Sequence, residues 1–183
     1  KEFGNIALLV LSDNCKKICE ELSKLDGIEK IYFNESKNFS NLTAENVSSF
    51  IATNFNSYTH ILFANNSNGK NIAPRVAGLL DVMIIPDVIE IIDKKTYKRP
   101  IYAGNAIATC KSKNKIDILT IRSTAFEEAK FSEKNAPISE IGTSISNNFT
   151  THLSSELTQS ERPELTSADI VVSGGRGLGS AEN

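Results

Sequence analysis

The sequence predicts an α/β fold: a mostly parallel sheet with helices on both faces, extended by antiparallel strands. Two observations carry this prediction. Three apolar strand segments are each followed by a segment of helical periodicity, and short strands separated by turn or charged residues come after them. Consecutive strand-then-helix units form parallel sheets that are covered by helices. The 183 residues, 40% of them hydrophobic, are enough to bury a core without disulfides or metal.

The first two units occupy the start of the chain. An apolar run at residues 5–11 is followed by a helix that we expect over residues 13–25, with Asp13 as its N-cap. A second strand is expected at residues 30–33. Its helix opens at Thr43, after which apolar residues recur near helical spacing.

The third unit joins a buried strand at residues 60–64 to a helix at residues 69–80 through a polar turn. Beyond Pro86 the period changes, because short apolar runs alternate with turn or charged residues. We expect antiparallel additions there, with strands at residues 88–92, 99–102, 106–110 and 116–121.

The rest of the chain is more polar. Residues 123–160 are rich in Ser, Thr, Asn and Glu and have weak periodicity, which is typical of a linker, a surface excursion, or one edge strand near residues 151–155. A strand is expected at residues 168–172, and it leads into the glycine-rich segment 173–179.

Composition excludes several functions. The 20 basic and 22 acidic residues give a formal net charge of −2, which argues against binding of nucleic acid through bulk positive charge. No run approaches eighteen consecutive apolar residues, so we expect no membrane insertion. The three cysteines, Cys15, Cys19 and Cys110, form no C-x-x-C pair, and we expect three reduced thiols in a reducing compartment.

The glycine-rich segment is the strongest candidate for a binding site. Gly175, Gly177 and Ser180 half-match the dinucleotide fingerprint, in which glycines let backbone N–H groups approach a phosphate. A glycine-rich turn of any α/β domain explains the spacing equally well. Arg176 adds a permanent cation among small residues, from which it could reach a phosphate or an electron-rich ring.

Other motifs predict structure rather than chemistry. Gly69 and Lys70 lie where a P-loop might lie, but the pattern needs glycine at 64 and Ser or Thr at 71, so we expect an N-capping turn with a solvated lysine. The two histidines, His60 and His152, are interpreted as structural or solvated, and they provide neither a zinc site nor a Ser-His-Asp triad. The residues alone define no catalytic constellation.

Three ordered blocks resemble a known family. The segment SERPEL at residues 160–165, followed by ADIVVSGGRGL at 168–178, resembles the signature that opens the FAD-binding domain of the electron transfer flavoprotein alpha subunit. Two upstream blocks are similar to the first domain of that family. They are YTHI at 58–61, which leads to GKN at 69–71 and PRVA at 74–77, and YAGNA at 102–106. Together the similarity covers nearly all of the chain.

The resemblance implies a domain organisation. Residues 1–160 would form the N-terminal α/β domain, of the adenine nucleotide alpha hydrolase-like type, without its first strand and helix. Residues 161–183 would begin a Rossmann-like FAD-binding domain, so we expect a fragment that is truncated at both ends. The chain departs from the family's usual motif G-L-K-S-G-E-N at Gly179 and Ala181.

The resemblance also implies a function. A member of this family would be an electron carrier rather than a catalyst, which pairs with a beta subunit as a heterodimer and binds FAD. It would pass electrons from flavoprotein dehydrogenases of fatty acid and amino acid oxidation to a membrane quinone oxidoreductase. Arg176 would lie beside the flavin ring and favour its reduced, anionic form, with Gly175 and Gly177 flanking it.

Two further expectations follow from the resemblance. AMP would be bound only by the beta subunit, and most FAD contacts would lie beyond Asn183, so we expect this chain alone to bind FAD weakly or not at all. The compartment would be the mitochondrial matrix, or the cytoplasm of a bacterium.

Two other functions stay open at this point. The chain could be an AMP-binding α/β module, although the loop at residues 64–69 offers Asn65, Asn66 and Asn68 but no phosphate cradle. It could also be a purely structural subunit-interaction domain.

Overall fold

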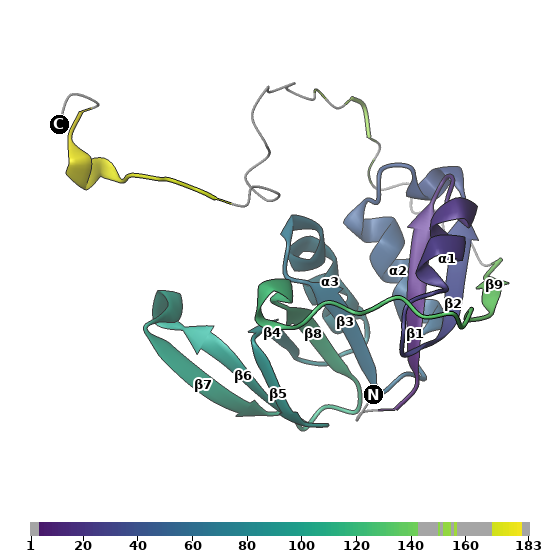
Figure 1. The fold of residues 1–183 in the computed structure, drawn as a ribbon, viewed down its shortest axis with the longest axis horizontal. Helices are drawn as coiled ribbons and strands as arrows, with labels where there is room; N and C mark the ends of the chain where they lie inside the picture. Colours follow the sequence, from purple (N-terminus) through teal and green to yellow (C-terminus); the bar gives the residue numbers. More distant parts are fainter. Residues whose placement is uncertain (1–3, 143–149, 151, 155, 157–169, 181–183) are drawn as a thin grey trace. The chain divides into compact units, whose positions relative to one another are not determined.

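The computed structural model describes residues 4–142, 150, 152–154, 156 and 170–180 (Figure 1). The chain divides into two compact units, Lys1–His152 and Leu153–Asn183. The described helices and strands of the first unit form an α/β domain, which confirms the predicted fold class for this part of the chain.

Parallel strands form the centre of the first unit. Among the described residues they make two three-stranded sheets, and every pairing within each sheet is parallel. In order across the first sheet the strands are β1 (Ile6–Ser12), β2 (Ile28–Glu35) and β9 (Ile138–Glu140). Across the second sheet they are β3 (His60–Ala64), β8 (Asp117–Ile121) and β4 (Ile84–Val88).

Helices cover both faces of the first sheet. Alternate residues of β1 point to opposite sides, and each set packs on a different cluster. Leu8 and Val10 pack on a cluster with Cys19, a residue of helix α1 (Lys16–Leu22). Leu9 and Leu11 pack instead on the larger core. That core contains apolar residues of η1 (Lys37–Phe39), α2 (Ala44–Asn54) and α3 (Ser67–Leu79).

An antiparallel sheet covers part of the second parallel sheet. It consists of β5 (Glu90–Asp93), β6 (Thr96–Ile101) and β7 (Ala106–Lys111), in that order. Tyr97 of β6 packs with Val88 and Leu119 in a separate buried cluster, whereas Ile118 belongs to the core with α2 and α3. The antiparallel strands are therefore confirmed, and they cover a sheet face for which helices were expected.

The strand expected at residues 116–121 is not an antiparallel addition. It is β8, the central strand of the second parallel sheet, flanked by β3 and β4. Ile118 and Leu119 are both fully buried, one on each face, which is typical of a central parallel strand. The strand expected at residues 88–92 is divided, because Ile89 separates β4 from β5.

The first helix is shorter than predicted, and Asp13 does not cap it. Cys15 is the N-cap residue and makes no side-chain capping bond. Its backbone N–H donates to Oε2 of Glu35 (3.2 Å), so a carboxylate from the end of β2 replaces the expected cap. At the other end, the Ser23 hydroxyl donates to the Glu20 carbonyl (2.7 Å), and the chain leaves the helix.

The polar stretch from residue 123 contains one strand that the sequence did not predict. β9 is short and pairs with β2, from Ile31↔Ile138 to Phe33↔Glu140. The edge strand expected near residues 151–155 lies largely outside the described residues. Of the strand expected at 168–172, only residues 170–172 are described, and they form no strand.

Candidate functional site

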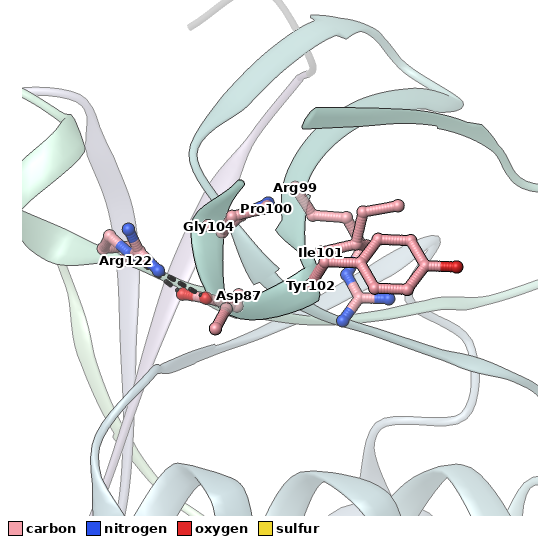
Figure 2. Close-up of a pocket in the computed structure, with 8 residues that line it drawn as sticks. Asp87, Arg99, Pro100, Ile101, Tyr102, Gly104 and Arg122 are labelled. Atoms are coloured by element: carbon pink, nitrogen blue, oxygen red, sulfur yellow. Dashed lines mark hydrogen bonds and ion pairs between the residues drawn. The ribbon is translucent and has the colours of Figure 1, made fainter. Parts of the chain in front are cut away.

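A polar cluster lies at the carboxyl ends of the strands of the second parallel sheet. Asn65 follows β3, Asp87 lies near the end of β4, and Arg122 follows β8. The Arg122 guanidinium donates to both carboxylate oxygens of Asp87, from Nε to Oδ1 (2.9 Å) and from Nη2 to Oδ2 (2.5 Å), as Figure 2 shows. Ligands of open α/β sheets bind at this edge, so the cluster occupies the expected place for a site.

The buried Thr120 hydroxyl links two members of the cluster, Asn65 and Asp87. The side chain is 1% exposed, and its hydroxyl donates to Asn65 Oδ1 (2.9 Å) while it accepts the backbone N–H of Asp87 (2.8 Å). The Asn65 amide then donates to Asp87 Oδ1 (2.6 Å). The hydrogen bond to Asp87, together with the negative charge of that carboxylate, raises the pKa of Arg122 above its ordinary value.

An open cavity of about 550 Å³ adjoins the cluster (Figure 2). Asp87 and Arg122 line one part, and Arg99 and the segment from Pro100 to Gly104 line the rest. Arg99 reaches the cavity from β6, and its Nε donates to the carbonyl of Pro86 (2.8 Å).

Strained backbone surrounds this cavity. Asp87 has φ 60°, and Tyr102, Ala103 and Gly104 follow one another with φ 50°, 52° and 90°. Each non-glycine residue held in the left-handed region costs roughly 1–3 kcal/mol, and such residues concentrate at functional sites. The sequence patterns did not predict a site at these residues. The YAGNA block at residues 102–106 indicated only the family resemblance.

A second polar cluster lies at the amino ends of β3 and β8. The carboxylate of Asp117 is fully buried, accepts the hydroxyl protons of Tyr97 (2.6 Å) and Ser112, and lies 3.2 Å from Lys95 Nζ. Burial, and then the bond to this carboxylate, raise the pKa of Tyr97 well above its ordinary value. His60 places Nε2 3.1 Å from the Tyr97 hydroxyl, so its predicted structural role is confirmed.

The turn before α3 is the predicted capping turn. The Asn66 side chain accepts the backbone N–H of Gly69 (2.9 Å), and Lys70 is exposed. A Cβ at Gly69 would lie 1.9 Å from the carbonyl oxygen of Ala64, so the turn requires glycine here. The amide oxygens of both Asn65 and Asn66 are therefore engaged inside the fold.

The cysteines are free thiols, as expected. Cys15 and Cys19 are buried, and desolvation raises the pKa of Cys15 to about 11 and also raises that of Cys19. High pKa values keep both thiols protonated near neutral pH, which makes them poor nucleophiles. No group of three or more His, Cys, Asp and Glu side chains with metal-binding geometry lies within the described residues.

The glycine-rich segment belongs to the second unit. Gly175 is the N-cap of the 3₁₀ turn η4 (Arg176–Leu178), and Arg176 is exposed. A Cβ added at Gly175 or Gly177 would meet no atom within 4 Å, so the backbone is open to approach on either side of the guanidinium. An exposed guanidinium between two open glycines can donate hydrogen bonds to an anionic group or stack on a planar one.

Fold and site define an α/β domain of the parallel-sheet class, with polar side chains gathered at the carboxyl edge. Within that class, the family model described as "Electron transfer flavoprotein domain" matches residues 1–145, and the chain belongs to this family. Among the described residues, no helix has the length and apolarity that a membrane crossing requires.

Individual relatives agree with the family match. The chain is 38% identical over 180 residues to the electron transfer flavoprotein subunit alpha of Pseudomonas aeruginosa, which covers 98% of this chain and 58% of the relative. It is 39% identical to that of Paracoccus denitrificans, over 100% of this chain and 59% of the relative. It is 38% identical to the mitochondrial subunit alpha of Dictyostelium discoideum, over 98% of this chain and 55% of the relative.

These comparisons confirm the resemblance to the alpha subunit that the three sequence blocks indicated. The chain spans somewhat more than half the length of these relatives. The relatives include bacterial proteins and mitochondrial ones, which accords with either of the two expected compartments.

Proposed function

We propose that this chain is part of the alpha subunit of an electron transfer flavoprotein, which holds FAD together with a beta subunit and carries electrons. The observation that carries the proposal is the family match over residues 1–145, combined with similarity to alpha subunits that extends to the exposed Arg176. The protein is a carrier, so its contribution is to position a cofactor and to set its electrostatic surroundings.

Arg176 has the charge that this role requires. Bound FAD would supply the redox chemistry, and the guanidinium would supply a fixed positive charge that stabilises negative charge beside it. Gly175 and Gly177 present open backbone on either side, so a bulky planar group can approach the arginine closely. Because Arg176 is exposed in the described segment, it reaches this role only when the rest of a cofactor site surrounds it.

The two domains that the resemblance implies would then have different tasks. Residues 1–160 form the first domain, which packs against the beta subunit and binds no FAD itself, and residues 161–183 begin the FAD-binding domain. AMP is held by the beta subunit, while flavoprotein dehydrogenases of fatty acid and amino acid oxidation and a quinone oxidoreductase bind transiently. The protein works in the mitochondrial matrix, or in the cytoplasm if its source is bacterial.

Co-expression tests this proposal. A polypeptide that contains this chain and continues past Asn183 is produced with a candidate beta subunit, and the complex is analysed by size-exclusion chromatography with flavin absorbance. We expect one heterodimer peak that carries the flavin spectrum. A heterodimer without flavin, or a polypeptide that stays monomeric in the presence of the beta subunit, would contradict the proposal.

A further inference from the structure

The cavity at the carboxyl edge contains one guanidinium that the fold orients but does not neutralise. The hydrogen bond from Nε of Arg99 to the Pro86 carbonyl fixes the plane of the group and leaves its two terminal nitrogens directed elsewhere. Within the described residues, no carboxylate forms an ion pair with Arg99. A forked donor held in this way is suited to a two-oxygen acceptor.

The charge balance of the cavity is positive. Of its charged lining residues, Arg122 is neutralised by its two contacts with Asp87, so the charge of Arg99 remains. Asp87 Oδ1 also accepts from the Asn65 amide, so the carboxylate is bonded to both Arg122 and Asn65. The cavity consequently offers hydrogen-bond donors and a net positive charge, which selects against cations and in favour of anions.

The backbone of the turn that follows Arg99 is held in a costly conformation. Tyr102 and Ala103 are both in the left-handed region, although neither is glycine, and the Tyr102 side chain is 80% exposed. Among the described bonds of this turn, the Asn105 N–H donates to the Tyr102 carbonyl (3.1 Å). Strain of this kind, beside a cavity at the carboxyl edge of a parallel sheet, is characteristic of a ligand-binding loop.

We propose that this cavity binds a small anion through a phosphate or carboxylate group, with Arg99 as the principal donor. The volume of about 550 Å³ lies in the range of small-molecule pockets. Arg122, which is held and neutralised by Asp87, lines the cavity as well, and so does the turn from Tyr102 to Gly104. All of the lining residues belong to the first unit, and the proposal holds whether or not the protein carries electrons.

Solution NMR of the 183-residue chain tests the proposal directly. The ¹⁵N-labelled protein is titrated with inorganic phosphate, and separately with acetate, at ionic strength held constant with sodium chloride. We expect saturable shifts at Arg99 and at the amides of residues 101–104. The tighter of the two titrations tells which group the site prefers. Shifts that remain linear, or that map to another surface, would overturn the proposal.

Two substitutions assign the binding to Arg99. Arg99→Gln removes the charge and the fork, and we expect it to weaken binding about tenfold or more, since a charge-assisted bond is lost. Arg99→Lys keeps the charge and should recover only part of the affinity. Lys113→Gln makes the same change of charge on an exposed loop lysine and should bind like the wild type. Equal binding by Arg99→Gln and the wild type would exclude the site.

A pair of substitutions at Ala103 covers the case in which loss of the Pro86 contact unfolds the Arg99 variants. Ala103→Glu puts a carboxylate at the cavity rim without changing the Arg99 contacts, and Ala103→Gln puts equal bulk there without charge. Both variants keep the left-handed backbone that Ala103 already has. We expect the Glu variant to bind anions at least tenfold more weakly than the Gln variant. Equal affinities would contradict an anion site.

Discussion

The hydroxyl of Tyr97 lies 2.6 Å from a carboxylate oxygen of Asp117, and both side chains are almost completely excluded from solvent. Tyr97 belongs to the antiparallel sheet and Asp117 to the parallel one, so this contact joins the two layers. Lys95, Ser112 and His60 also surround the carboxylate, which would otherwise be a buried and uncompensated charge.

Removing the Tyr97 hydroxyl is expected to destabilise the first unit. Tyr97→Phe keeps the apolar packing and deletes a hydrogen bond to a charged acceptor, at a cost of about 1.5–3 kcal/mol. Urea unfolding followed by circular dichroism measures the change. Tyr102→Phe is the control, because that side chain is exposed, and it should change the free energy of unfolding little. Equal stability of Tyr97→Phe and the wild type would show that the contact contributes nothing.

Alkaline pH should weaken the same contact. The pKa of Tyr97 is raised in the folded protein, so its contribution is fully present below the ordinary value of 10.0 and is lost as the pH rises above it. Cys15, with a pKa of about 11, acts in the same direction. We expect the free energy of unfolding to fall from about pH 9 upward. Tyr97→Phe should show a shallower fall, and an unchanged slope would contradict this assignment.

Thiol labelling distinguishes the buried cysteines from the accessible one. At pH 8 the folded chain should take up one iodoacetamide, at Cys110, because burial shields Cys15 and Cys19 and raises their pKa values. Mass spectrometry of the intact chain and of its peptides counts and locates the labels. All three thiols should react in denaturant. Rapid native labelling of Cys15 would argue against the packing of α1.

The helix cap at Asn66 offers a test of local structure. Asn66→Ala removes the acceptor for the Gly69 N–H and should cost about 1 kcal/mol of stability. Asn68→Ala, at the second residue of α3, introduces a better helix former without removing a cap and should be neutral or slightly stabilising. Denaturant unfolding of the two variants decides the point. A cost at Asn68 equal to that at Asn66 would mean that the cap is not the cause.

The charge of Arg176 can be tested in the assembled flavoprotein. If Arg176 lies beside the ring as proposed, Arg176→Ala removes a cation there and should lower the reduction potential of bound flavin by on the order of 60 mV, the shift that equals tenfold in a one-electron equilibrium. Arg176→Lys keeps the charge and should shift the potential less. Spectroelectrochemical titration gives the values. A potential unchanged by Arg176→Ala would remove Arg176 from the cofactor site.

Local patterns predicted much of this fold correctly. The three strand-then-helix units, the antiparallel strands and the capping turn at Asn66 follow from periodicity and turn chemistry over a few residues. The exceptions have particular causes. Asp13 was a good candidate cap. The backbone N–H of Cys15 donates instead to the carboxylate of Glu35, which is twenty residues further along the chain. β9 has too few residues for a periodic signal, and its pairing with β2 defines it.

The sequence by itself determined the fold class, the free thiols, the family resemblance and the identity of Arg176 as a fixed cation between glycines. Only the tertiary structure decided that β8 runs parallel between β3 and β4, and that Arg99, Asp87 and Arg122 line one cavity. The physical reason is the separation along the chain of the residues that make each contact. Helices, caps and turns depend on neighbours within a few positions, whereas strand order and the meeting of charges from three strands depend on contacts between segments that are far apart in the chain.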